Sequence, residues 1–121
     1  MGSELTRIVI ADDDQMMLAL VKNIVVPLGW RIHTATNGTT AMQVISDTVP
    51  DLVISDINMP GLLGTDLLRI LRSQAALSHI PVVLVSDAVM ERQALEAGCD
   101  AFVAKHLLVK ELLPTLRKLV R

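Results

Sequence analysis

The feature that most restricts the fold of this chain is the regular alternation of two hydrophobic patterns. Short apolar runs rich in β-branched residues recur five times, within residues 7–11, 31–35, 52–55, 81–85 and 101–104. Each run is followed by a segment with helical spacing of its apolar residues, at about 18–28, 39–47, 65–73, 88–97 and 108 to the end. Runs that are apolar throughout are typical of parallel strands buried on both faces. Because parallel strands need crossover helices, the sequence predicts an α/β fold, a doubly wound (βα)5 domain with a five-stranded parallel sheet.

The length and composition exclude several classes of protein. The 121 residues fit one domain, and the longest apolar run is too short to cross a membrane. A formal net charge of −2 gives no basic surface for direct binding of nucleic acid or anionic membranes. We expect residues 1–5 to be a cloning remnant or leader and residues 6–121 to form the domain. The single cysteine, Cys99, is expected to be a small buried thiol in a reducing, cytoplasmic protein.

Polar side chains interrupt the apolar pattern at one recurring place, the carboxyl end of a predicted strand. They are Asp12, Asp13 and Asp14 after the first strand, Asp56 after the third, Ser86 after the fourth and Lys105 after the fifth. Ligands of open α/β sheets bind at this edge, where the winding order reverses. A strand order of 2-1-3-4-5, with helices on both faces, makes the first and third strands neighbours. The sequence then predicts that Asp12, Asp13 and Asp56 lie close together.

Three neighbouring carboxylates need a counter-charge to stay ionised. An oxygen-only set with few protein ligands suits Mg²⁺, which keeps several of its water molecules. Lys105 would add a positive charge from the opposite side. Carboxylates, a metal ion, a lysine and a hydroxyl together favour phosphoryl transfer with a carboxylate as the nucleophile.

Four segments carry a resemblance to a known family: residues 8–14, 51–61, 80–86 and 97–105. Through them nearly the whole chain resembles the response-regulator receiver domains of two-component signalling systems, which have a flavodoxin-like fold. The resemblance implies the following roles: Asp56 as phosphoacceptor; Asp12, Asp13, Asp56 and the backbone carbonyl of Asn58 as Mg²⁺ ligands; Ser86 and Lys105 as phosphate contacts; and Phe102 as the switch aromatic. Phe102 as plain core packing stays open as an alternative.

The resemblance also implies what the domain does. It would accept a phosphoryl group from a histidine kinase or a phosphotransfer protein and transmit the change to a downstream output domain or protein. The surface that responds would be formed by the fourth helix, the fifth strand and the fifth helix. Such a domain transfers a phosphoryl group only to itself and hydrolyses it, so it is not an enzyme acting on an outside substrate. Homodimer formation is left open.

Two other functions use a fold of this kind. A pseudo-receiver would use the same fold as an interaction module that does not depend on phosphorylation. A flavodoxin-like cofactor binder would need a phosphate-cradling loop after the first strand, where the three aspartates would instead repel phosphate.

Two further expectations concern the first predicted helix, at about 18–28. Asp14 is expected to cap this helix, since its first amide groups need acceptors. Met16, Met17 and Leu20 extend the apolar character of the helix beyond the face formed by Leu18, Val21, Val25 and Leu28. They either pack into the core or, as the resemblance suggests, help to dock the phosphodonor protein.

Four features depart from the family pattern. His106 follows Lys105 where proline in a cis bond is usual, so we expect a trans bond. The fourth helix is expected to be about one turn short, and Pro114 is expected to kink the last helix. Asp87 follows Ser86 in place of a small neutral residue. It is a candidate modulator that would repel the phosphoryl group, cap the fourth helix, or pair with Lys105 or the metal.

Overall fold

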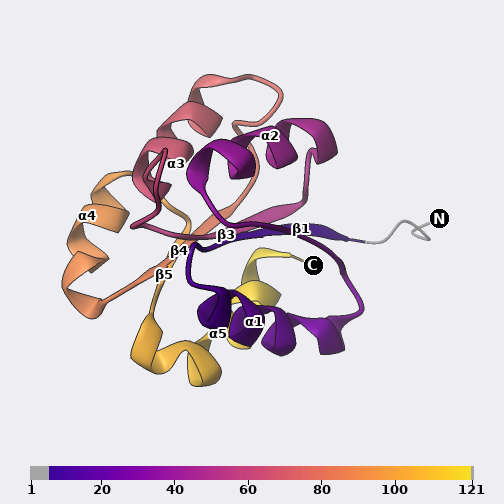
Figure 1. Ribbon diagram of the computed structural model, residues 1–121, viewed down its shortest axis with the longest axis vertical. Coiled ribbons are helices and arrows are strands. Elements are labelled where there is room, and N and C mark those ends of the chain that lie inside the picture. The colour runs from indigo at the N-terminus through magenta and orange to yellow at the C-terminus, as the bar shows by residue number, and fades with distance from the viewer. Residues whose placement is uncertain (1–5, 121) are drawn as a thin grey trace.

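The computed structural model describes residues 6–120, in which the strands form one parallel sheet of order β2-β1-β3-β4-β5 (Figure 1). The strands are β1 (Arg7–Ala11), β2 (Arg31–Ala35), β3 (Leu52–Asp56), β4 (Val82–Ser86) and β5 (Ala101–Ala104). All four neighbouring pairs are parallel. The predicted fold class and strand order are confirmed. Residues 1–5, the predicted leader, lie outside the described part.

Helices connect the strands and cover both faces of the sheet. They are α1 (Gln15–Val25), α2 (Gly38–Thr48), α3 (Gly64–Ser73), α4 (Glu91–Glu96) and α5 (Leu108–Leu119), with 3₁₀ turns η1 (Val26–Leu28), η2 (Ala88–Met90) and η3 (Lys105–Leu107). Helices α1 and α5 lie on one face, and α2, α3 and α4 lie on the other (Figure 1). Within residues 6–120, no helix combines the length and apolar character needed to span a bilayer.

Successive residues of the central strands point to opposite faces of the sheet and pack into two separate hydrophobic cores. Val9 and Val53 pack against α2, α3 and α4, whereas Ile8, Ile10 and Ile54 pack against α1 and α5. Each of these five side chains is at most 1% exposed. Burying one such side chain contributes about 1.5–3 kcal/mol, so the apolar runs stabilise both layers at once. This two-sided burial explains why the strands read as nearly continuous apolar runs.

Several predicted boundaries need small corrections. Strand β4 begins at Val82 because Pro81 has no N–H; only its carbonyl joins the sheet, accepting from the Val53 amide at 3.0 Å. The predicted helix at 88–97 begins as the turn η2, and α4 has only six residues, which confirms that it is short. Cys99 is half-buried against the core rather than fully buried. Burial raises the pKa of its thiol.

Two departures from the family pattern concern the backbone. No peptide bond in the described residues is cis, so the trans bond predicted before His106 is confirmed. Helix α5 continues through Pro114 to Leu119. Pro114 is exposed, so water can reach the carbonyl group that loses its partner there. The kink itself stays a prediction.

Two glycines hold the segment that follows β3. The Gly64 amide donates to the Ile57 carbonyl at 2.8 Å, and the Gly38 amide donates to the Pro60 carbonyl at 3.2 Å. A Cβ atom at Gly64 would overlap the backbone oxygen of Asp56, and one at Gly38 would overlap that of Leu62. This close approach fixes residues 57–63 against the amino ends of α2 and α3.

Candidate functional site

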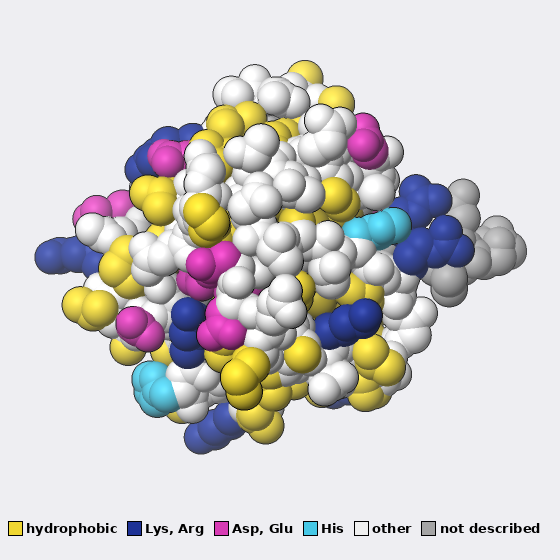
Figure 2. Space-filling model, in the orientation of Figure 1, with side chains coloured by type: hydrophobic (Ala, Val, Ile, Leu, Met, Phe, Trp, Pro, Cys, Tyr) yellow, Lys and Arg dark blue, Asp and Glu magenta, His cyan; other side chains and the backbone are white. Residues whose placement is uncertain are grey.

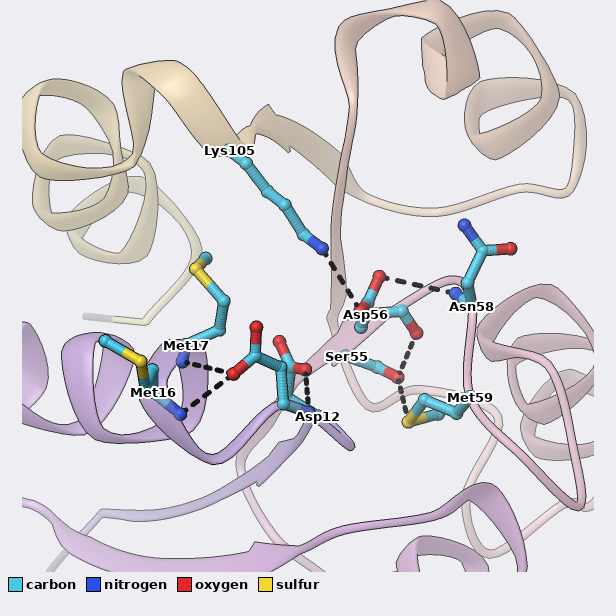
Figure 3. Close-up of polar contacts among 9 residues, drawn as sticks. Asp12, Met16, Met17, Ser55, Asp56, Asn58, Met59 and Lys105 are labelled. Carbon is cyan, nitrogen blue, oxygen red and sulfur yellow. Dashed lines mark hydrogen bonds and ion pairs between the residues drawn. The ribbon is translucent and has the colours of Figure 1, made fainter.

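Three carboxylates meet at the carboxyl edge of the sheet. Asp56 is the last residue of β3, and Asp12 and Asp13 follow β1. One carboxylate oxygen from each lies within 4.8 Å of the others. Asp12 and Asp56 are only 3% and 4% exposed, whereas Asp13 faces solvent. The convergence predicted from the strand order is confirmed; Figure 3 shows Asp12 and Asp56 at this edge.

Local hydrogen bonds fix the backbone around Asp12. Its amide donates to the Ala35 carbonyl at 3.0 Å, and its Oδ1 accepts from the Asp14 amide at 2.9 Å. The Asp14 carboxylate accepts from the amides of Met16 at 2.9 Å and Met17 at 3.4 Å. Capping of α1 therefore falls to Asp14, as predicted. The carboxylate of Asp12 accepts from the Asp14 amide and remains close to the carboxylates of Asp13 and Asp56; these three carboxylates are called the acidic group below.

Burial and the neighbouring charge of Asp56 disfavour the ionised form of Asp12. The pKa of Asp12 is raised to about 6, chiefly by burial; the hydrogen bond from the Asp14 amide opposes this shift, and the charge of Asp56 adds to it. The ionised form of Asp12 is thus less stable in the folded protein than in water. A bound cation would relieve this cost, because it favours the ionised carboxylates.

A pH dependence of stability follows for the protein in a metal chelator. The pKa of Asp12 is higher in the folded state than its ordinary value of 3.8. The stability that this group contributes is therefore full below about pH 3.8 and is lost as the pH rises through about 6. Chemical unfolding of wild type and Asp12→Asn between pH 4 and 8 checks this. We expect the variant to gain roughly 2 kcal/mol on wild type as the pH rises; a constant difference would contradict the shift.

Lys105 closes the site from the side of β5. Its Nζ lies 3.4 Å from Oδ2 of Asp56, and Oδ1 of Asp56 accepts from the Asn58 amide at 3.3 Å (Figure 3). Burial lowers the pKa of Lys105, but attraction to Asp56, Asp12 and Asp87 outweighs it, so the net shift is upward. The lysine is thus held as a cation beside the most buried part of the acidic group. The trans bond to His106 does not keep Lys105 from reaching the site.

Ser55 also contacts the site, and sequence reasoning missed it. This residue is fully buried, and its hydroxyl donates to the backbone carbonyl of Asp56 at 2.8 Å. The same hydroxyl lies 3.9 Å from Sδ of Met59. The signal was present, because Ser55 is the one uncharged polar residue in an otherwise apolar strand before Asp56.

The remaining predicted site residues lie around this centre. Ser86 is buried at the end of β4, paired with Ala104, one position beyond the partner of Asp56 in the ladder. Phe102 is half-buried and packs on the core beneath α2, α3 and α4, so its role as a switch stays a prediction. The side chain of Asn58 points away from Asp56 (Figure 3). A part in metal binding would therefore rest on its backbone carbonyl.

Asp87 is exposed and precedes the turn η2. Its side chain makes no capping hydrogen bond, so the alternative in which it caps the fourth helix is wrong. The backbone supplies the cap instead, through the Met90 amide bonded to the Asp87 carbonyl at 2.9 Å.

The apolar residues on α1 divide between the two alternatives. Met17 is half-buried and packs against the core between the sheet and α1, whereas Met16 and Leu20 are 83% and 37% exposed. Met16 and Met17 lie beside Asp12 (Figure 3). On the face drawn in Figure 2, acidic side chains gather near the middle, with apolar side chains next to them. Core packing thus explains Met17, and an exposed apolar surface beside the acidic group remains at Met16 and Leu20.

Comparison with known proteins gives matches over most of the chain. The family described as "Response regulator receiver domain" matches residues 8–117. The chain is 33% identical over 117 residues to the chemotaxis protein CheY of Pseudomonas aeruginosa, covering 93% of this chain and 94% of that one. It is 34% identical over 116 residues to the response regulator MprA of a Mycobacterium species, but spans only 50% of that protein.

A solved structure supports the fold. The receiver domain of a sensor histidine kinase from Pseudomonas aeruginosa superposes with a TM-score of 0.87 and 21% identity, covering 96% of this chain and 98% of that one. That structure contains a magnesium ion in its active-site cleft.

Proposed function

Because this chain belongs to the response regulator receiver domain family of two-component signalling, we propose that it is a phosphorylation-dependent switch that accepts a phosphoryl group on Asp56. The observation that carries the proposal is the meeting of Asp56 with Asp12, Asp13 and Lys105 at one edge of the sheet. A buried carboxylate flanked by a lysine is arranged to act as a nucleophile on a charged phosphorus centre.

In the proposed transfer, one bond to phosphorus forms as another breaks. A carboxylate oxygen of Asp56 attacks phosphorus in a phosphorylated histidine of the donor protein, so that a P–O bond forms and the P–N bond breaks. The electron pair of that bond returns to the imidazole nitrogen, which takes up a proton. Lys105 offsets the negative charge of the transferred group, and the Ser86 hydroxyl donates a hydrogen bond to it. Later attack by water on phosphorus releases inorganic phosphate and restores the Asp56 carboxylate.

A divalent cation fits the acidic group. Carboxylate oxygens of Asp12, Asp13 and Asp56 lie close enough to share one ion. Mg²⁺ prefers oxygen ligands and often has few from the protein, with water molecules completing its coordination. The backbone carbonyl of Asn58 would complete the protein ligands. When bound, Mg²⁺ would supply positive charge that offsets the carboxylates and the phosphoryl oxygens. The magnesium in the related kinase receiver is consistent with this assignment.

Magnesium is expected to stabilise the folded domain. If the Kd is about 1 mM, then ~10 mM Mg²⁺ adds roughly 1.4 kcal/mol to the free energy of unfolding, because the unfolded chain lacks the site. Chemical unfolding with and without the ion measures this gain. Asp13→Asn should lose most of it, since Asp13 is exposed and its removal leaves the core intact. Equal stabilisation of both proteins would contradict the metal assignment.

The output of the switch follows from the added charge. The phosphoryl oxygens would draw in Ser86 and Lys105, and Phe102 would turn inward. This would change the surface formed by α4, β5 and α5. In this proposal the input comes from a histidine kinase or phosphotransfer protein in the cytoplasm. The output passes to a downstream domain or protein, with a homodimer as one form of the active state.

The exposed apolar residues of α1 are proposed to dock the phosphodonor protein. Met16→Gln together with Leu20→Gln should slow transfer from the donor protein by roughly tenfold, equivalent to about 1.4 kcal/mol of lost binding. Transfer from a small phosphodonor should be unchanged, because the acidic group is untouched. Val26→Thr is the matched control, since Val26 is 52% exposed in the turn after the far end of the same helix. Equal slowing with both donors would instead indicate damage to the site.

The proposed function is tested by the mass of the intact protein. Incubation with acetyl phosphate and Mg²⁺ should add about 80 Da, the mass of one phosphoryl group, and a chelator should prevent the gain. If the folded protein gains no mass, the alternative applies, a pseudo-receiver that binds partners without phosphorylation. The exposed carboxylate of Asp87 beside Ser86 is the observation that favours that alternative.

A further inference from the structure

We propose that Asp87 tunes the phosphorylation site through its charge, strengthening the binding of a divalent cation and opposing the entry of an anionic phosphodonor. This inference rests on the proposed function and assigns a regulatory role within the same site.

The sheet register brings Asp87 to the site. Ser86 pairs with Ala104 at the end of the β4–β5 ladder, and Asp87 and Lys105 are the next residues of the chain after these two strand ends. Lys105 in turn contacts Asp56 at 3.4 Å. Strand β4, which Asp87 follows, lies between β3, which ends in Asp56, and β5, which precedes Lys105.

Two further observations agree with this placement. The Asp87 carboxylate is not used as a helix cap, so its charge is free to act on its surroundings. Together with Asp56 and Asp12, Asp87 also contributes to the attraction that keeps Lys105 charged, after allowance for burial, which lowers the pKa of the lysine.

The number of charges decides the direction of the effect. Asp12, Asp13, Asp56 and Asp87 are four carboxylates, and within residues 6–120 Lys105 is the one ammonium group that contacts Asp56. A divalent cation bound to this set still leaves one excess negative charge. Neutralising Asp87 would bring the loaded site to electrical balance. An incoming phosphodonor, which is an anion, would then meet less repulsion, and the cation would be attracted less strongly.

The size of the effect follows from Coulomb's law. Two unit charges about 6 Å apart interact strongly enough in water to change an equilibrium or rate roughly threefold, and more where the surroundings are less polar. We expect changes of about three- to tenfold at low ionic strength. They should shrink as salt is added, because the screening length falls to about 10 Å at 0.1 M salt.

The experiment compares Asp87→Asn with wild type in two measurements. The first is Mg²⁺ affinity by calorimetry, without a phosphodonor. The second is the rate of mass gain with acetyl phosphate at saturating Mg²⁺, so that weaker metal binding does not affect the rate. Asp87→Glu keeps the charge. Asp47→Asn removes one exposed charge near the end of α2, at the opposite edge of the sheet. Both control variants should behave as wild type.

The expected result is a pair of changes with opposite signs. Asp87→Asn should bind Mg²⁺ about three- to tenfold more weakly and gain the phosphoryl group about three- to tenfold faster. Unchanged values, or slower labelling together with weaker metal binding, would overturn the proposal. In the second case Asp87 would act as a ligand or positioning group. If wild type gains no mass, the proposed function fails by itself, and the Mg²⁺ measurement still decides whether Asp87 attracts the cation.

Discussion

Asp56→Asn is expected to abolish the gain of about 80 Da with either a small phosphodonor or a donor protein. An amide is not a nucleophile toward phosphorus, and within the site no other carboxylate pairs with Lys105 in the described structure. The fold should survive, because the substitution preserves shape and removes one of three mutually repelling charges. The melting temperature in a chelator should therefore be equal to or higher than that of wild type.

A matched control is available just before the same strand. Asp51 lies just before β3, at the other edge of the sheet, where its carboxylate accepts from the Arg7 amide at 2.8 Å. Asp51→Asn removes the same charge by the same chemical change and should leave labelling unchanged. If Asp56→Asn is labelled at the wild-type rate, Asp56 is not the acceptor.

The second large effect concerns stability. Gly38→Ala and Gly64→Ala should each lower the free energy of unfolding by about 3 kcal/mol, because inserting a methyl group into close-packed backbone forces it to move. The added Cβ atoms would overlap the Leu62 and Asp56 carbonyl oxygens, respectively, and a backbone oxygen cannot rotate away. Urea unfolding with a constant slope measures the change.

Gly29→Ala separates this overlap from backbone strain. Gly29 has a φ of +74°, but a Cβ there would meet no atom within 4 Å. Alanine at this position should cost only about 1 kcal/mol, the penalty for the left-handed conformation. If all three variants lose the same stability, overlap with the segment after β3 is not the cause.

Much of the fold was predictable because local pattern and topology agree. The apolar runs at 7–11 and 52–55 could only be buried on both faces, which requires helices on both sides of the sheet. The meeting of Asp12 with Asp56 followed in turn, since parallel neighbours end at the same edge.

Other features depend on contacts that a sequence pattern does not contain. Helical spacing placed Met16 and Met17 outside the apolar stripe but could not show that Met17 reaches the core while Met16 stays exposed. The glycines at 38 and 64 are explained only by backbone oxygens from distant segments. For Asp87, the sequence left a helix cap and pairing with Lys105 open, and only the structure shows that its side chain makes no capping hydrogen bond.

The way the site is assembled also has a consequence for its appearance during protein synthesis. Asp12 and Asp13 leave the ribosome first, Asp56 comes in the middle of the chain, and Lys105 arrives only with the fifth strand. The helix that covers β5 and the α1 side of the sheet, α5, is made last of all. A nascent chain that has completed β1 and β3 would already hold the carboxylates but would lack their cationic partner. The complete site should therefore form only when the domain is almost completely synthesised.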